Sequence, residues 1–142
     1  MNIDTAILSP VIVLIGWSLI MFLWMYATRI PAMIKAKVKL DPTIPKAEAM
    51  ANIPANVRWK ADNYNHLMEQ PTIFYPLAIS LALLDAGTGM NLYFAWAYVI
   101  LRIMHSLVQA LVNKIKLRFF LFILSNVALF GMTINGLMVI LK

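Results

Sequence analysis

The sequence of 142 residues contains no cysteine, which excludes disulfide bonds, zinc–thiolate sites and a cysteine nucleophile. Acidic side chains are scarce as well, with 6 Asp and Glu against 12 Lys and Arg. There is no glycine-rich phosphate loop, no nucleophile elbow and no His-Glu-x-x-His pattern. The sequence therefore excludes several common enzyme classes, and we expect no metal site.

Apolar residues are abundant instead. They make up 62% of the chain, and the mean hydropathy is +0.78, which leaves too little polar surface for a water-soluble domain of this size. The net charge of +6 is better explained by basic cytoplasmic loops than by nucleic-acid binding, since no basic helix lies outside the apolar runs. We expect a single membrane domain over residues 1–142 and no nucleic-acid partner.

Four apolar runs predict an all-α integral membrane protein with the architecture of a four-helix bundle. The predicted spans cover residues 6–28, 58–84, 92–112 and 117–141, with a cytoplasmic loop over residues 29–57. The first run lacks the basic start of a secretory signal, so it is expected to be a retained span. Pro71 and Pro76 predict a kink in the second span, and a short helical turn is expected near residues 47–51.

The basic residues predict the orientation of the chain. Seven of the 12 Lys and Arg fall between Arg29 and Lys60, and three more lie in the link between the third and fourth spans. The opposite side carries Asp4, Asp85 and Lys142. Because loops rich in Lys and Arg stay in the cytoplasm, both termini are predicted on the non-cytoplasmic side. In a prokaryote, the membrane would be the bacterial inner membrane.

Polar residues form one stripe on the third span, at helical spacings of three and four. They are Arg102, His105, Ser106 and Gln109. We expect this stripe to face the bundle interior or a wet cavity, with Arg102 paired to Glu69 or Asp62. Two interpretations stay open, because Arg102 could be a structural counter-ion or could bind a ligand. His105 could equally make an interhelical hydrogen bond.

The second span begins with a polar half in which Asp62, His66 and Glu69 share one face. These residues predict either an ion pair that fixes helix packing or a ligand site. Arg29 ends the first span and Arg118 begins the fourth, on the same predicted membrane face. Because guanidinium pairs with carboxylate through two hydrogen bonds, a small anionic ligand with carboxylates would suit this arrangement.

The run from Asn63 to Tyr75, NYNHLMEQPTIFY, resembles the MAPEG family, the membrane-associated proteins in eicosanoid and glutathione metabolism. The pattern is an asparagine-containing polar turn, a hydrophobic residue, Glu, then Pro and an aromatic pair. The four spans and the basic link between the last two agree with this family over nearly the whole length. The chain looks like a divergent, bacterial member.

The resemblance implies a homotrimer that binds glutathione as a co-substrate in an intersubunit cleft on the cytoplasmic side. It also implies contact with membrane lipid and with a lipophilic substrate. By position, Arg118 matches the arginine that stabilises the glutathione thiolate, so it is the expected catalytic residue. The expected glutathione-binding residues, to which the polar stripe adds Arg102, are Arg29, Asn65, His66, Glu69, Arg102, His105 and Arg118.

Several positions depart from the family pattern. Asp62 and Asn65 stand where its enzymes often have arginines, Gln109 replaces a tyrosine, and Phe119 and Phe122 replace hydroxyl-bearing residues. The first hypothesis is therefore a glutathione-dependent transferase or peroxidase acting on a lipophilic electrophile. The second is a non-catalytic binding or scaffold protein of the same fold. A small multidrug-type transporter is a third, although the first span lacks the carboxylate that such transporters need.

Overall fold

The computed structural model describes residues 3–39 and 41–141, apart from the side chain of Lys46, so Lys142 lies outside the described residues. The described part is helical and contains no strand. Its elements are η1 (Thr5–Ile7), α1 (Leu8–Lys35), α2 (Lys46–Ala49), α3 (Ala55–Glu69), α4 (Pro71–Leu83), α5 (Gly89–Leu111) and α6 (Ile115–Ile140). The prediction of an all-α chain is confirmed.

Among the described residues, three helical segments are long and apolar enough to cross a bilayer. They cover Thr5–Lys35, Gly89–Leu111 and Ile115–Ile140. In each, more than half of the most apolar stretch lies on the outer surface of the chain. Such exposed apolar surface is compatible with lipid or with contacts to further helices.

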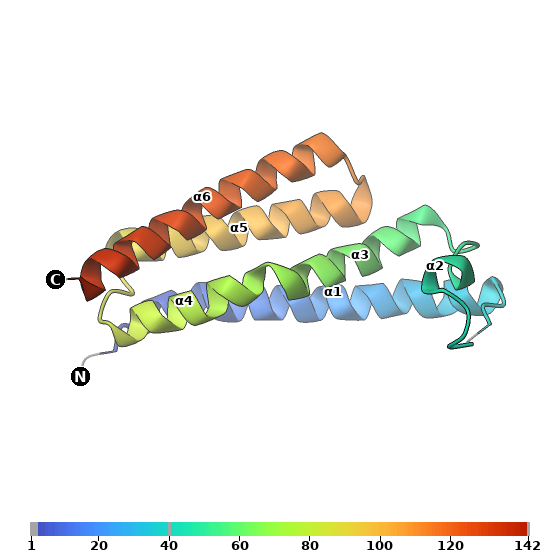
Figure 1. The fold of residues 1–142 in the computed structure, drawn as a ribbon, viewed down its shortest axis with the longest axis horizontal. Coiled ribbons are helices and arrows are strands. Elements are labelled where there is room, and N and C mark those ends of the chain that lie inside the picture. Colours follow the sequence, from blue (N-terminus) through green and yellow to red (C-terminus); the bar gives the residue numbers. More distant parts are fainter. Residues whose placement is uncertain (1–2, 40, 142) are drawn as a thin grey trace.

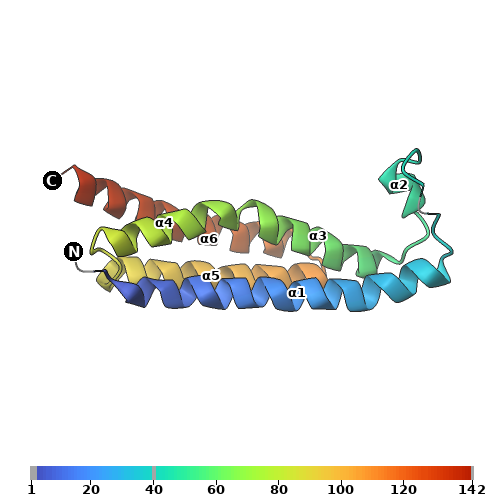
Figure 2. The ribbon, with the colours of Figure 1, turned by 90° about the horizontal axis from the view of Figure 1, so that it is seen from below.

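The long helices run side by side and alternate in direction, as Figures 1 and 2 show. Both ends of the chain lie at one end of this assembly, and α2 lies at the other. Helix α5 packs against α1, α3 and α6. Toward the short link between α5 and α6, α6 diverges from α3 (Figure 1).

The second predicted span consists of two consecutive helices, α3 and α4, separated at Gln70. Pro71 has no N–H to donate to the carbonyl of Leu67, and Pro76 likewise leaves the carbonyl of Thr72 without its helical partner. Gln70 itself keeps a right-handed helical backbone, with φ −72° and ψ −38°. Regular helical hydrogen bonding is therefore interrupted where the kink was predicted. The chain continues in the same direction from α3 into α4.

Helix α1 extends seven residues beyond the predicted end of the first span at Thr28. Pro31 lies inside this extension, where it removes only the hydrogen bond to the carbonyl of Ala27. The predicted irregular loop therefore begins at Ala36 rather than at Arg29. The expected short turn is present as α2, and α3 begins directly after Pro54.

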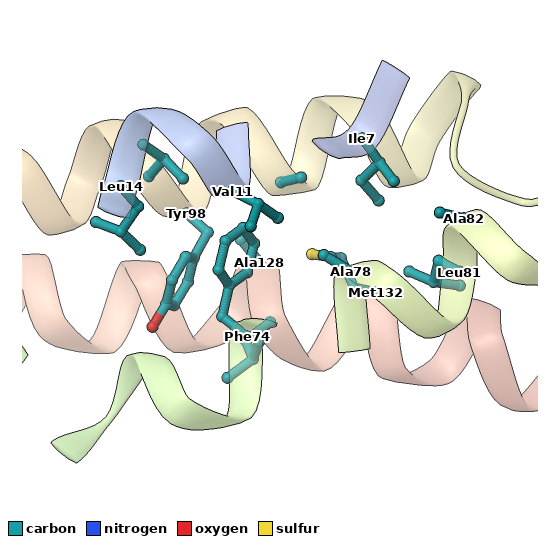
Figure 3. Close-up of a cluster of buried hydrophobic side chains, with 13 residues drawn as sticks. Ile7, Val11, Leu14, Phe74, Ala78, Leu81, Ala82, Tyr98, Ala128 and Met132 are labelled. Atoms are coloured by element: carbon teal, nitrogen blue, oxygen red, sulfur yellow. The ribbon is translucent and has the colours of Figure 1, made fainter. Parts of the chain in front are cut away.

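The main hydrophobic core, drawn in Figure 3, lies toward the end of the helices at which Figure 1 marks the termini. It joins Ile7, Val11 and Leu14 near the start of the chain to residues of α4, α5 and α6. Phe74 and Tyr98 stack in it with ring centroids 4.5 Å apart. In the half toward α2, the described residues form a smaller buried cluster of Met21, Leu67 and Ala110. Polar side chains occupy the remaining interior of that half.

Candidate functional site

The polar stripe on α5 is buried, as predicted. Relative exposure is 0% for Arg102 and Ser106 and 3% for His105 and Gln109. Ser106 accepts hydrogen bonds from Trp17 Nε1 at 3.0 Å and from Asn63 Nδ2 at 2.7 Å. The stripe is therefore enclosed by α1 and α3 rather than exposed on the outer surface.

The predicted pairing of Arg102 with Glu69 or Asp62 is wrong. Arg102 Nη2 donates to His66 Nδ1 at 2.8 Å and to the His66 carbonyl oxygen at 3.4 Å. Its Nε and Nη1 atoms are buried without a hydrogen-bond partner among the described residues. Both carboxylates are exposed on α3, whereas the imidazole lies within reach of the buried guanidinium.

The two histidines and Arg118 line one cavity of about 390 Å³, named here the histidine cavity. Its lining residues are His66, His105, Ile115, Arg118, Phe119 and Phe122. The two imidazoles stack with centroids 4.9 Å apart and an interplanar angle of 23°. Phe122 lies edge-on to His66 at 5.7 Å. The cavity thus combines one guanidinium and two imidazoles with apolar walls.

A second cavity of about 620 Å³, named here the arginine cavity, lies between the end of α1, α2 and α3. Its polar lining residues are Arg29, Arg58, Trp59, Asp62, Asn65 and Asn113, and its apolar ones are Ala47, Met50, Ile53, Val57 and Ala61. Arg29 Nη2 donates to the sulfur of Met50 at 3.8 Å, which ties α1 to the segment after α2. Both cavities fall in the size range of small-molecule sites.

Asn113 connects the two cavities, and sequence reasoning did not select it. It lines the arginine cavity and accepts a hydrogen bond from Arg118 Nη1, which belongs to the histidine cavity. Its backbone is left-handed, with φ 50°, at the end of α5, a conformation that asparagine tolerates better than most residues. An asparagine directly after a predicted helix and directly before Lys114 was the available signal.

The predicted site residues fall into three groups. His66, His105 and Arg118 come together in the histidine cavity, and Arg102 lies behind His66. Arg29 and Asn65 line the arginine cavity instead. Glu69 is exposed at the end of α3 and lines neither of these two cavities.

The departures from the family pattern shape the histidine cavity. Phe119 and Phe122 form its apolar wall on α6, and the Phe122 ring also lies 5.9 Å from the Arg102 guanidinium carbon. Gln109 is buried with its Oε1 atom unpaired among the described residues. Phe119 and Phe122, at positions where the family pattern has hydroxyl groups, therefore contribute aromatic surface to this cavity.

A further set of partly buried polar contacts was not predicted. Tyr98 donates its hydroxyl to Gln70 Oε1 at 2.5 Å, and Gln70 Nε2 donates to Asn126 Oδ1 at 2.8 Å. Asn135 Nδ2 donates to Asn91 Oδ1 at 2.9 Å. Polar residues inside otherwise apolar helices are the sequence signal for such contacts, but their partners depend on how the helices are rotated.

The fold and the site together define a helical protein whose long helices can span a membrane. Two polar cavities, connected through Asn113, lie at one end of these helices. The sequence profile of the MAPEG family matches residues 7–138, so this chain belongs to the MAPEG family. Searches of curated proteins and of solved structures gave no match. Membership agrees with a membrane location and points to glutathione-related chemistry as the functional class.

Proposed function

We propose that this protein is a membrane-bound, glutathione-dependent transferase or peroxidase that acts on a lipophilic electrophile. The observation that carries the proposal is the histidine cavity, where Arg118 lies beside two imidazoles and apolar walls. Through Asn113, this cavity adjoins the arginine cavity. A tripeptide that reached from one cavity to the other would have its thiol near Arg118.

Arg118 is the proposed catalytic residue because a guanidinium next to a thiol favours the thiolate, which is the nucleophile. In transfer, the thiol proton leaves to solvent, the sulfur forms a bond to the electrophilic carbon, and the leaving group takes the displaced electron pair. In peroxidase action, two glutathione molecules reduce a hydroperoxide to an alcohol and water and become a disulfide. Both reactions need the same stabilised thiolate.

The arginine cavity would hold the carboxylates of glutathione. Arg29 and Arg58 both line it, and guanidinium groups bind carboxylates through two parallel hydrogen bonds. Asn65 and Asn113 add amide groups that can donate or accept hydrogen bonds. Glutathione, with two carboxylates and an amine, matches this mixture of charged and amide side chains.

We further propose that α3 and α4 together form a fourth membrane span and that three chains assemble into a homotrimer. MAPEG proteins are often homotrimeric, and Glu69 is exposed next to the histidine cavity residue His66, where a neighbouring copy could complete an intersubunit site. The particle mass of detergent-purified protein, corrected for detergent, should equal that of three chains. A monomeric particle that still binds glutathione would overturn the intersubunit site.

Calorimetric titration of purified protein with glutathione tests the functional proposal. Binding is expected at millimolar glutathione or below, and Arg118→Ala should weaken it about 10-fold or more, the usual effect of losing a hydrogen bond to a charged group. Lys116→Ala is the matched control, because Lys116 is an exposed cation two residues away that lines neither cavity. Wild-type protein that binds no glutathione at millimolar concentration would refute the proposal.

The second candidate is a non-catalytic binding protein of the same fold. Phe119 and Phe122 favour it, because the histidine cavity has no hydroxyl group among its lining residues. Turnover of chlorodinitrobenzene with glutathione separates the two candidates. A rate above the uncatalysed one, lost in Arg118→Ala, supports the transferase, whereas glutathione binding without turnover of this or of a lipid hydroperoxide supports the binding protein.

A further inference from the structure

The guanidinium of Arg102 is fully buried, and its hydrogen bonds run to a single residue of α3. Nη2 lies 2.8 Å from His66 Nδ1 and 3.4 Å from the His66 carbonyl oxygen. A buried charge is costly unless something compensates it, so this contact contributes strongly to the placement of both side chains.

The chemistry of the two groups determines where the imidazole proton lies. Guanidinium carries five N–H donors and no acceptor, so His66 Nδ1 must accept the hydrogen bond with its lone pair. A neutral His66 therefore carries its proton on Nε2. The ring is held on its faces as well, by stacking on His105 and by the edge contact with Phe122.

We propose that Arg102 is a positioning residue that fixes His66 as the Nε2–H tautomer, so that His66 donates a hydrogen bond to the anionic ligand of the histidine cavity. His66 lines this cavity together with Arg118, whereas Arg102 lies outside the lining. The anion would then meet a guanidinium and an imidazole N–H at once. Charge-assisted hydrogen bonds of this kind are about twice as strong as neutral ones.

This assignment limits the role that His66 can have in the histidine cavity. The Nδ1 lone pair of His66 is occupied by Arg102, so His66 cannot take a proton there from a bound thiol. His66 is therefore a donor to the thiolate rather than the base that forms it. The ligand role of His66 rests on the proposed function, whereas the tautomer does not.

The composition of the chain makes the tautomer measurable, because it has only 2 histidines. Protein labelled with 15N at histidine and arginine, reconstituted in lipid, is examined by solid-state NMR near pH 8, above the ordinary histidine pKa of about 6.5. His66 should give a pyridine-type Nδ1 and a pyrrole-type Nε2 signal, with an Nδ1 cross-peak to an arginine Nη. His105→Asn assigns the signals, and His66→Asn does so if that variant does not fold.

Arg102→Met removes the donor without adding another. The Nδ1 signal of His66 should then move to the position of a nitrogen free of hydrogen bonds, while the His105 signals keep their tautomer. A pyrrole-type Nδ1 in the wild type, or an Nδ1 signal unchanged by Arg102→Met, overturns the assignment. If Arg102→Met does not fold, the wild-type cross-peak to arginine decides instead.

The donor role is tested by adding glutathione. The His66 Nε2 signal should shift, and binding should weaken about 10-fold or more in His66→Phe but only slightly in His66→Gln, whose amide N–H lies near the position of Nε2. Equal binding by the two variants, or an unmoved Nε2 signal in the presence of bound glutathione, overturns the donor role. If the wild type binds no glutathione, the proposed function and the donor role fail together, while the tautomer result still decides the part played by Arg102.

Discussion

At the scale of the residue, single hydroxyl and amide groups join the helices in the half of the molecule toward α2. The oxygen of Ser106 on α5 accepts from Trp17 on α1 and from Asn63 on α3, so one atom joins three helices. Asn63 is 1% exposed, and no water can replace its partner without entering the bundle. Interior polar groups of this kind are costly to leave unpaired.

Ser106→Ala is expected to destabilise the protein by about 1–3 kcal/mol for each donor it leaves unpaired. The measurement is unfolding of detergent-solubilised protein followed by helix content. Ser80→Ala is the control, because Ser80 is exposed on α4 and should leave the midpoint nearly unchanged. Equal midpoints for both variants would contradict the interior role of Ser106.

At the scale of the element, the junction of α3 and α4 is the most specialised part of the chain. Two prolines remove backbone hydrogen bonds there, and the side chain of Gln70 reaches across to Tyr98 on α5 and Asn126 on α6. Asn126 itself donates to the carbonyl oxygen of Phe122, the residue that packs against His66. The junction thus links the direction of α3 to the wall of the histidine cavity.

Gln70→Leu should cost about 1–2 kcal/mol, since interhelical hydrogen bonds in membranes average about 0.6 kcal/mol and reach about 1.7 kcal/mol. Combining it with Tyr98→Phe in a double-mutant cycle isolates the contact between the two side chains. The double variant should lose less than the sum of the single ones. Strict additivity would show that the hydrogen bond contributes nothing to stability.

At the scale of the whole molecule, the apolar core and the basic residues lie toward opposite ends of the helices. The apolar core lies toward the chain ends, and the cavities lie toward α2 and the link between α5 and α6. The basic residues gather at that second end. If that end faces the cytoplasm, as the basic residues predict, a cytoplasmic co-substrate would reach the cavities without crossing the membrane.

The absence of native cysteine allows a direct test of this orientation. Cysteine introduced at Lys116 should react with an impermeant maleimide only in inside-out vesicles, and cysteine at Thr88 only in right-side-out vesicles. Both positions are exposed in the chain. Labelling of both positions from the same side would refute α5 as a span and, with it, the predicted topology.

The sequence by itself determined the helical class, the family and the burial of the α5 stripe. Long apolar runs leave the backbone no alternative in lipid except helices, and a charge inside such a run must face inward. The turn near α2 and the break at Pro71 followed from proline chemistry, which is local. These features depend on neighbours in the chain, so they can be inferred without coordinates.

Only the tertiary structure decided the partners of the polar residues. Arg102 could have met a carboxylate or an imidazole on α3, and helix rotation and depth selected His66. Likewise, Glu69 stays exposed while Asn113 joins the two cavities. Side-chain pairing between helices depends on how they rotate, diverge and shift along one another, and those quantities are set by packing over the whole bundle. Residue spacing along one helix therefore predicted which residues lie inside, and the packing of all the helices determined what each of them contacts.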